Sequence, residues 1–194
     1  MNIDEDDTKL FRLLEPGEFG IYTQSDELPV SDCPVYLMEG VGGICLSGTA
    51  TVQVFSHRFR IVRGMVLALF PWQLISIKEV SDDFGIRFFR ISHDMFTDTL
   101  SSLWRARPGF FFYMRTHIAS EPREEYVGRF LNFCDLLAYR AENAPVICRR
   151  ESVMQLLRVF YWDVYTIYLN DPQAEKTAYC LLYTSPSPRD VEES

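Results

Sequence analysis

The chain has 194 residues and a formal net charge of −8; 47% of its residues are hydrophobic and 14% are aromatic. This length fits one domain with a helical appendage, or one domain and a fragment of another. The composition excludes an intrinsically disordered chain. Six acids lie near the two ends, so residues 8–190 carry 19 basic and 21 acidic side chains. Because this body is nearly neutral, the sequence does not predict nucleic-acid binding by the chain itself.

The five cysteines are widely scattered, and no two of them form a Cys-x-x-Cys pair. This pattern is typical of reduced thiols in a cytoplasmic protein. The N-terminus is acidic and polar, unlike a signal peptide, and no apolar run approaches the roughly 20 residues of a membrane span. We therefore expect a cytoplasmic location.

Residues 1–34 are acidic at first and then rich in Pro, Gly, Ser and Asp, which predicts a partly loose segment with one short strand at 19–22. Between 35 and 92, strand-like segments alternate with turn signals. The predicted strands are residues 36–38, 43–46, 50–55, 57–62, 65–70, 74–78 and 84–91. Short strands at this spacing indicate a small antiparallel barrel or sandwich.

The hydrophobic period changes after Ser92, which is a suitable N-cap for a helix that ends near Leu103. The apolar run 110–114 predicts a short buried helix. Ser120 is the predicted N-cap of a long helix, and a second long helix spans about 147–169. The chain is therefore predicted to be mainly β and then α, with a small antiparallel β-barrel followed by an αα-hairpin.

The second long helix carries more apolar surface than one helical partner can cover. In addition to its main apolar stripe, it presents Val159, Tyr161, Trp162 and Tyr165 on other faces. This excess predicts a homodimer through the C-terminal helices, and the alternative is that the surface packs on the barrel. The predicted dimer-interface residues are Val153, Leu156, Leu157, Phe160, Val164 and Ile167.

The sequence lacks the residue groups that catalysis and metal binding require. His57, His93 and His117 are far apart in the chain, and no HxH, HExxH or Cys/His cluster occurs, so we expect no metal. There is no Gly-x-Ser-x-Gly motif and no Cys/His pair close in sequence. The glycine-rich residues 40–43 lead into a strand rather than a helix, which argues against a phosphate loop. We therefore expect neither a cofactor nor an enzymatic activity.

A small barrel can hold one small ligand among its inward-facing side chains. By alternation, the predicted inward residues are Ile44, Val52, Val54, Phe59, Ile61, Phe70, Ile75 and Phe88. Trp72, which follows a proline, is predicted to close one end. The alternative is that these side chains only fill the barrel.

Residues 180–190 read CLLYTSPSPRD, which resembles the translation of a sequencing adapter. On this interpretation the genuine protein sequence stops near Tyr179, and the gene itself continues. We therefore expect residues 171–194 to be an artefactual or disordered tail.

Residues 44–55 and 59–71 together resemble the cupin-type sensor domain of AraC-family transcription regulators. In that family a glycine turn, a strand and a proline follow the central hairpin, and Gly64 to Pro71 has this pattern with one extra residue. The other similar segments are residues 81–84, the helix start at Ser92 and residues 156–163. The resemblance extends over about 36–170.

This resemblance implies a cupin-like barrel at 35–92 and a helical dimerisation region at 93–170. It also implies that the chain is the ligand-sensing and dimerisation portion of a bacterial regulator with a small-molecule effector. Family members bind DNA through a C-terminal domain with two helix-turn-helix motifs, and this chain has no matching segment. Metal-binding cupins carry histidines on the central strands, and here none occupies the matching positions.

Two other functions remain open from the sequence. One is a stand-alone, metal-free cupin binding module with a filled barrel. The other is a metal-free cupin isomerase, for which Tyr36 and His57 are the candidate bases near the barrel.

Overall fold

The computed structural model describes residues 12–103, 108–115 and 117–171. The strands are β1 (Phe19–Tyr22), β2 (Val35–Tyr36), β3 (Gly40–Ser47), β4 (Thr49–Val54), β5 (His57–Val62), β6 (Val66–Leu69), β7 (Leu74–Lys78) and β8 (Gly85–Ile91). The helices are η1 (Ser25–Glu27), α2 (His93–Leu100), η2 (Ser101–Leu103), α3 (Pro108–Met114), α4 (Glu124–Asn143) and α5 (Val146–Asn170). The predicted order of antiparallel strands followed by helices is confirmed. The predicted tail and residues 180–190 lie outside the described residues.

The strands form two four-stranded antiparallel sheets that face each other. Sheet A has the order β1-β8-β3-β6, and sheet B has the order β2-β7-β4-β5. Together they enclose the interior of a cupin-like fold, although the strand pairing gives two sheets rather than one closed ring. The strand β1 comes from the N-terminal segment and pairs with β8, with Phe19 opposite Ile91.

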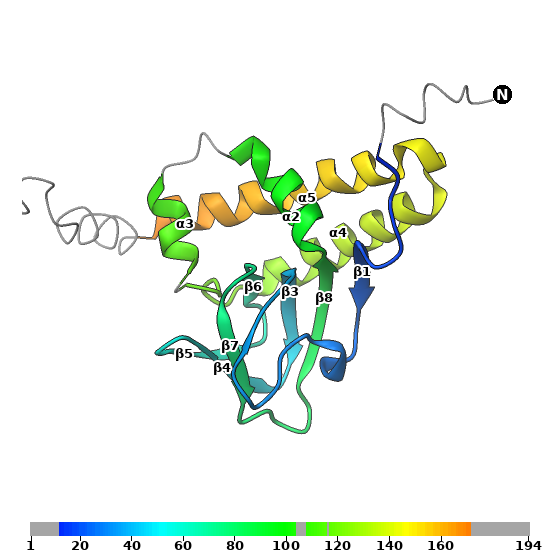
Figure 1. The fold of residues 1–194 in the computed structure, drawn as a ribbon. Helices are drawn as coiled ribbons and strands as arrows, with labels where there is room; N and C mark the ends of the chain where they lie inside the picture. Colours follow the sequence, from blue (N-terminus) through cyan, green and yellow to red (C-terminus); the bar gives the residue numbers. More distant parts are fainter. Residues whose placement is uncertain (1–11, 104–107, 116, 172–194) are drawn as a thin grey trace, which may run out of the picture.

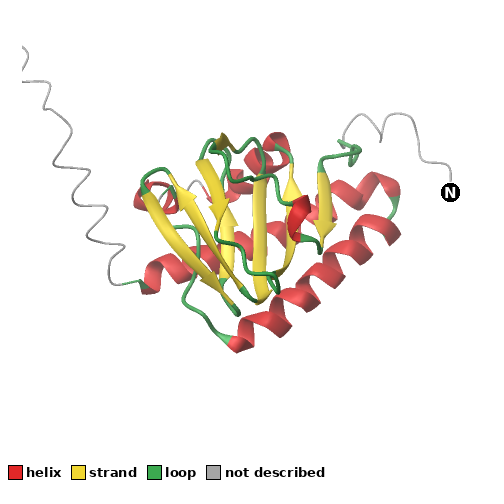
Figure 2. Cartoon of the chain, turned by 90° about the horizontal axis from the view of Figure 1, so that it is seen from below, coloured by secondary structure: helices red, strands yellow, loops and turns green. Residues whose placement is uncertain are grey.

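The long helices cover the outer side of sheet A (Figures 1 and 2). Helix α4 packs on β3 and β8, and α5 packs on α4 and α2. Ser92 caps α2 as predicted, because its side chain accepts a hydrogen bond from the Met95 amide at 3.2 Å. None of the described helices combines the length and the hydropathy that a membrane span requires.

The prediction that Ser120 caps the first long helix is wrong, because α4 begins at Glu124. Residues 118–120 instead run along the edge of β6, where the Ser120 amide donates to the Val66 carbonyl at 2.9 Å. The Ser120 hydroxyl accepts from the Val66 amide at 3.0 Å. This pairing occupies the serine side chain that would otherwise cap a helix.

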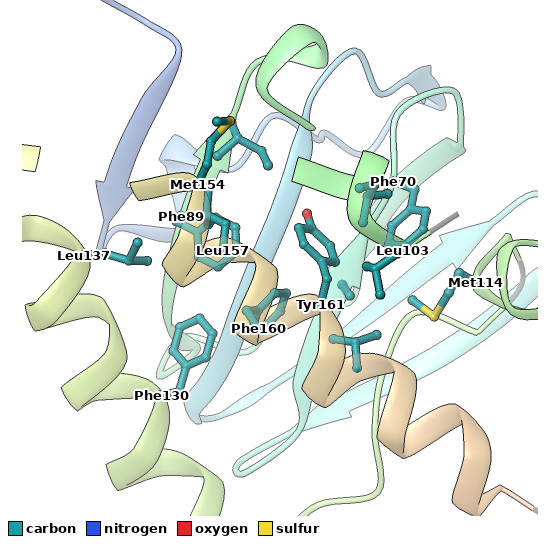
Figure 3. Close-up of a cluster of buried hydrophobic side chains, with 14 of the residues drawn as sticks. Phe70, Phe89, Leu103, Met114, Phe130, Leu137, Met154, Leu157, Phe160 and Tyr161 are labelled. Carbon is teal, nitrogen blue, oxygen red and sulfur yellow. The ribbon is translucent and has the colours of Figure 1, made fainter. Parts of the chain in front are cut away.

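Strand β3 separates two hydrophobic cores, because its side chains point alternately to the two sides of sheet A. Val41 and Cys45 belong to the core between the sheets, whereas Ile44 belongs to the core beneath the helices. Gly42 also faces the helices, and a Cβ atom there would lie 2.8 Å from the Phe160 ring. The missing side chain therefore lets aromatic rings lie directly against the strand (Figure 3).

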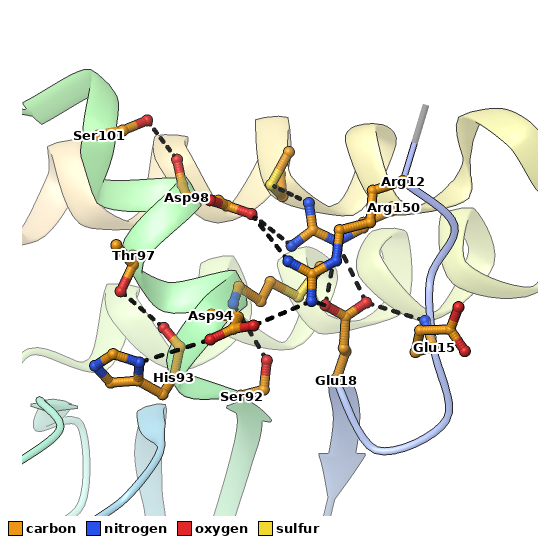
Figure 4. A network of polar contacts seen from close by, with 12 residues as sticks. Arg12, Glu15, Glu18, Ser92, His93, Asp94, Thr97, Asp98, Ser101 and Arg150 are labelled. Carbon is orange, nitrogen blue, oxygen red and sulfur yellow. Dashed lines mark hydrogen bonds and ion pairs between the residues drawn. The ribbon is translucent and has the colours of Figure 1, made fainter. Parts of the chain in front are cut away.

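A buried ionic network joins the segment before β1 to the helical layer (Figure 4). The Arg150 guanidinium of α5 lies 3.2 Å from the Glu18 carboxylate and donates to Asp98 of α2 at 2.7 Å. The side chains of Arg150 and Glu18 are 5% and 7% exposed. Arg12 extends the network outward to Glu18 and Asp94 at 3.1 and 3.2 Å.

Candidate functional site

The space between the two sheets is the site that the sequence predicts for a ligand. It contains an apolar cavity of about 20 Å³, measured as the volume open to the centre of a water molecule. The lining residues are Leu28, Val30, Val41, Gly43, Val52, Ile61, Leu67, Leu69, Ile75, Ile77, Phe84 and Ile86. This volume holds about one water molecule, and an apolar lining offers it no hydrogen bond. The interior is therefore almost completely filled by side chains.

Most of the predicted ligand-binding residues do lie at this interior. The ones in or beside the core between the sheets are Val52, Val54, Phe59, Ile61, Ile75 and Phe88. Val54, Ile61, Ile75 and Phe88 have no exposed surface, and Phe59 is half-buried at the margin. Their placement agrees with the strand alternation, and their role in ligand binding stays a prediction.

The inward orientation predicted for Ile44 and Phe70 is wrong. Both side chains belong to the core between sheet A and the helices. The physical reason is that the helices bury the outer side of sheet A, so β3 and the segment after β6 are apolar on both faces. Alternation of hydrophobicity therefore cannot show which face points inward.

Trp72 does not line the cavity, and its side chain is 56% exposed. It lies in the turn between β6 and β7, where its φ of +70° is unusual for a residue other than glycine. Its ring lies against His93, with the ring centroids 5.8 Å apart. This turn directs the side chain away from the interior that we expected it to close.

Six strand residues that line the cavity were not among the predicted inward positions, namely Val41, Gly43, Leu67, Leu69, Ile77 and Ile86. Val41 belongs to β3, which is buried on both faces, so the alternation of hydrophobic residues does not show which face points inward. Leu28 and Val30 come from the loop between β1 and β2, and no sequence pattern places a loop over a core.

The predicted dimer-interface residues are mostly buried within a single chain. Val153, Leu157, Phe160 and Val164 are at most 5% exposed and pack in the core beneath the helices. This burial within one chain leaves the four side chains little surface to offer a second copy, and their role in a dimer interface stays a prediction. Leu156 and Ile167 are half-buried. The exposed apolar side chains toward the C-terminal half of α5 are Val159, Trp162 and Leu169.

The titratable groups of the described part of the chain do not gather into a metal site: no cluster of three or more His, Cys, Asp or Glu side chains occurs there. Tyr36 is 62% exposed and His57 is also exposed, so neither candidate base of the isomerase hypothesis faces the interior. Burial raises the pKa of the Cys45 thiol, and it raises that of Cys134 to about 11. Both thiols therefore stay protonated near neutral pH, in a form that is a poor nucleophile.

Comparison with known proteins identifies the architecture. No protein-family model and no curated protein matches the sequence. Among solved structures, apo ToxT K231A from Vibrio cholerae strain SCE256 overlaps with a TM-score of 0.51 at 12% identity, over 87% of this chain and 65% of that chain. The chain shares the fold of ToxT. It spans about two-thirds of the length of ToxT.

Two further overlaps are looser. ToxT from Vibrio cholerae O395, bound to (E)-4-(8-methylnaphthalen-1-yl)but-3-enoic acid, gives a TM-score of 0.46 at 15% identity, over 86% of this chain and 65% of that chain. The AraC-like transcriptional activator CuxR gives 0.39 at 10% identity, over 73% of this chain and 47% of that chain.

Proposed function

We propose that this chain is the ligand-sensing and dimerisation portion of a bacterial AraC-type transcription regulator. The observation that carries the proposal is the fold shared with ToxT over 87% of the chain. The sequence resemblance of residues 36–170 to the AraC-family sensor domain supports it independently. A ligand would act by favouring one placement of the helices over another.

The cavity between the sheets has to enlarge before an effector can bind there. Known ligand pockets enclose roughly 300–1,000 Å³, whereas this cavity has about 20 Å³. Leu28 and Val30 lie on a loop rather than a strand, and both are half-buried. Their displacement exposes less apolar surface to water than separation of the two sheets would, so we propose this loop as the entrance.

The test is a thermal-shift screen of the purified chain against a panel of metabolites. A ligand present at 100 times its dissociation constant should add roughly 2.7 kcal/mol to the free energy of unfolding and raise Tm. The variant Val52→Phe fills the cavity and should abolish the response to a ligand that binds between the sheets. If no metabolite class stabilises the chain, the sensing proposal is contradicted.

A stand-alone binding module is the second candidate, and the filled interior favours it. On this hypothesis the sandwich is only a scaffold, and the outer surface contacts a partner protein. Val52→Phe would then leave partner binding unchanged, which separates this candidate from the first.

A further inference from the structure

The second core, between sheet A and the helices, contains one polar group that its surroundings do not explain. Tyr161 of α5 is completely buried, and its hydroxyl has no hydrogen-bond partner among the described residues. Nearly all buried polar groups in proteins are hydrogen-bonded, because burial without a partner removes the bonds that water would make. The burial also raises the pKa of this phenol, so the hydroxyl remains a donor at any physiological pH.

The walls around this hydroxyl are aromatic. The Tyr161 ring lies edge-on to Phe70, Phe96 and Phe160, with centroid distances of 5.9, 5.7 and 5.2 Å. Figure 3 shows the hydroxyl directed away from the α5 backbone, on the side where Phe70 lies. Apolar walls around one oriented polar group are the usual composition of a small-molecule site.

A glycine of β3, Gly40, lies next to the Tyr161 hydroxyl and the Phe96 ring. A Cβ atom at Gly40 of β3 would lie 3.2 Å from the Tyr161 hydroxyl and 2.6 Å from the Phe96 ring. The hydroxyl therefore lies close to the β3 backbone, and the Phe96 ring covers the space that a side chain at position 40 would take. In this structure an aromatic ring, that of Phe96, fills this position.

One wall can move. Phe70 and Phe160 are 7% and 5% exposed, whereas Phe96 of α2 is half-buried and reaches the surface. The Phe96 ring also stacks edge-on against Phe70 at 5.0 Å. Rotation of this side chain toward solvent would leave a slot of one aromatic ring between Phe70, Tyr161 and Gly40.

We propose that this slot binds a neutral aromatic molecule with one hydrogen-bond acceptor, which takes the place of the Phe96 ring and accepts a hydrogen bond from Tyr161. The aromatic walls select a ring, and the hydroxyl selects an acceptor such as a carbonyl. A carboxylate is disfavoured because these walls carry no charge to compensate its desolvation. The inference rests on the proposed sensing function. It adds a chemical class of effector and a binding position separate from the cavity between the sheets.

The test compares two probes of the same shape, acetophenone and ethylbenzene, of which only the first has an acceptor. Titration calorimetry on the full chain should show tighter binding of acetophenone by about five- to tenfold, the effect of one neutral hydrogen bond. Tyr161→Phe should remove this preference without unfolding the chain, since it deletes only a hydroxyl that makes no hydrogen bond to the described residues. Tyr139→Phe, which alters an exposed ring on α4, is the matched control and should keep the preference.

Phe96→Ala supplies the second variant, because it opens the slot permanently. It should bind both probes about tenfold more tightly than wild type and retain the preference for acetophenone. Three outcomes overturn the proposal: wild type binds neither probe, Tyr161→Phe keeps the preference, or Phe96→Ala leaves both affinities unchanged. If a metabolite stabilises wild type and Tyr161→Phe equally, this slot is excluded while the sensing function stands.

Discussion

At the scale of single residues, two glycines lie in such different surroundings that we expect the same substitution to have opposite effects on stability. Gly64 has a φ of +81°, and a Cβ atom there would lie 2.8 Å from the Arg123 carbonyl oxygen. Gly128 lies on the exposed face of α4 with open space around it. The first position requires glycine for its backbone conformation, whereas the second only weakens a helix.

We expect Gly64→Ala to destabilise the chain by at least about 1–2 kcal/mol, from backbone strain and the contact with Arg123. Gly128→Ala should stabilise it by about 0.5–1 kcal/mol. Urea denaturation of both variants measures the two effects. Equal shifts of the denaturation midpoint in the same direction would contradict the prediction.

The ionic network offers a second residue-scale prediction. Arg150→Met leaves the buried Glu18 carboxylate without its main partner, and such a loss costs about 3–5 kcal/mol. Arg12→Met removes a half-exposed arginine from the same carboxylate and should cost less than about 1 kcal/mol. The free energies of unfolding of the two variants provide the measurement, and similar costs would show that Arg150 is not the centre of the network.

The Cys134 thiol gives a pH dependence. Burial raises its pKa from 9.0 to about 11, so the folded chain holds this proton at a pH where the unfolded chain loses it. Its contribution to stability is fully present below pH 9 and is lost as the pH rises to about 11. We expect a loss of roughly 2–3 kcal/mol across this window.

Other groups titrate in the same range, so the measurement is the difference between wild type and Cys134→Ala in urea unfolding from pH 8 to 11. This difference should shrink or reverse as the pH rises. A constant difference would contradict the raised pKa.

At the scale of elements, helix α5 has two different apolar surfaces. One packs on sheet A and α4, while Val159, Trp162 and Leu169 are 54%, 44% and 49% exposed. These residues lie within about one face of the helix, where an isolated monomer gains nothing from their exposure. We propose this outer face, rather than the buried stripe, as the contact between two copies.

Trp162→Glu should therefore convert a dimer into a monomer with little change in Tm at low protein concentration. Light scattering coupled to gel filtration gives the mass directly. Tyr139→Glu, on the exposed face of α4, is the control and should leave the mass unchanged. A wild-type chain that is monomeric at high micromolar concentration would rule out this interface.

At the scale of the whole molecule, sheet A and the helices share one apolar core, so we expect the sandwich and the helices to unfold as one cooperative unit. Sheet A buries Ile44, Phe89 and Ile91 against the helical layer, with no exposed surface on any of the three. A fragment of residues 1–122 lacks α4 and α5 and exposes this apolar side. We expect it to bind a hydrophobic dye and to lose its cooperative thermal transition. A sharp transition in the fragment would show instead that the sandwich folds independently.

Local sequence patterns determined the elements of this protein. Turn residues and alternation located the strands from β3 to β8 within a few residues, and the change of period after Ser92 marked the start of the helices. Ser92 was identified as a cap because its side chain acts on its own helix. These features follow from interactions between near neighbours in the chain, which the sequence displays directly.

The tertiary structure alone decides which face of each strand and helix is buried and against which neighbour. The orientation of Ile44 depends on helices more than 70 residues away that bury the outer side of sheet A. The same packing buries the main apolar stripe of α5. It also places Ser120 beside β6, where its side chain bonds to Val66 instead of capping α4. It also placed the Tyr161 hydroxyl against Gly40, 121 positions earlier in the chain. A strand that is apolar on both faces has no periodic signal, so only the packing of distant elements selects its inner face.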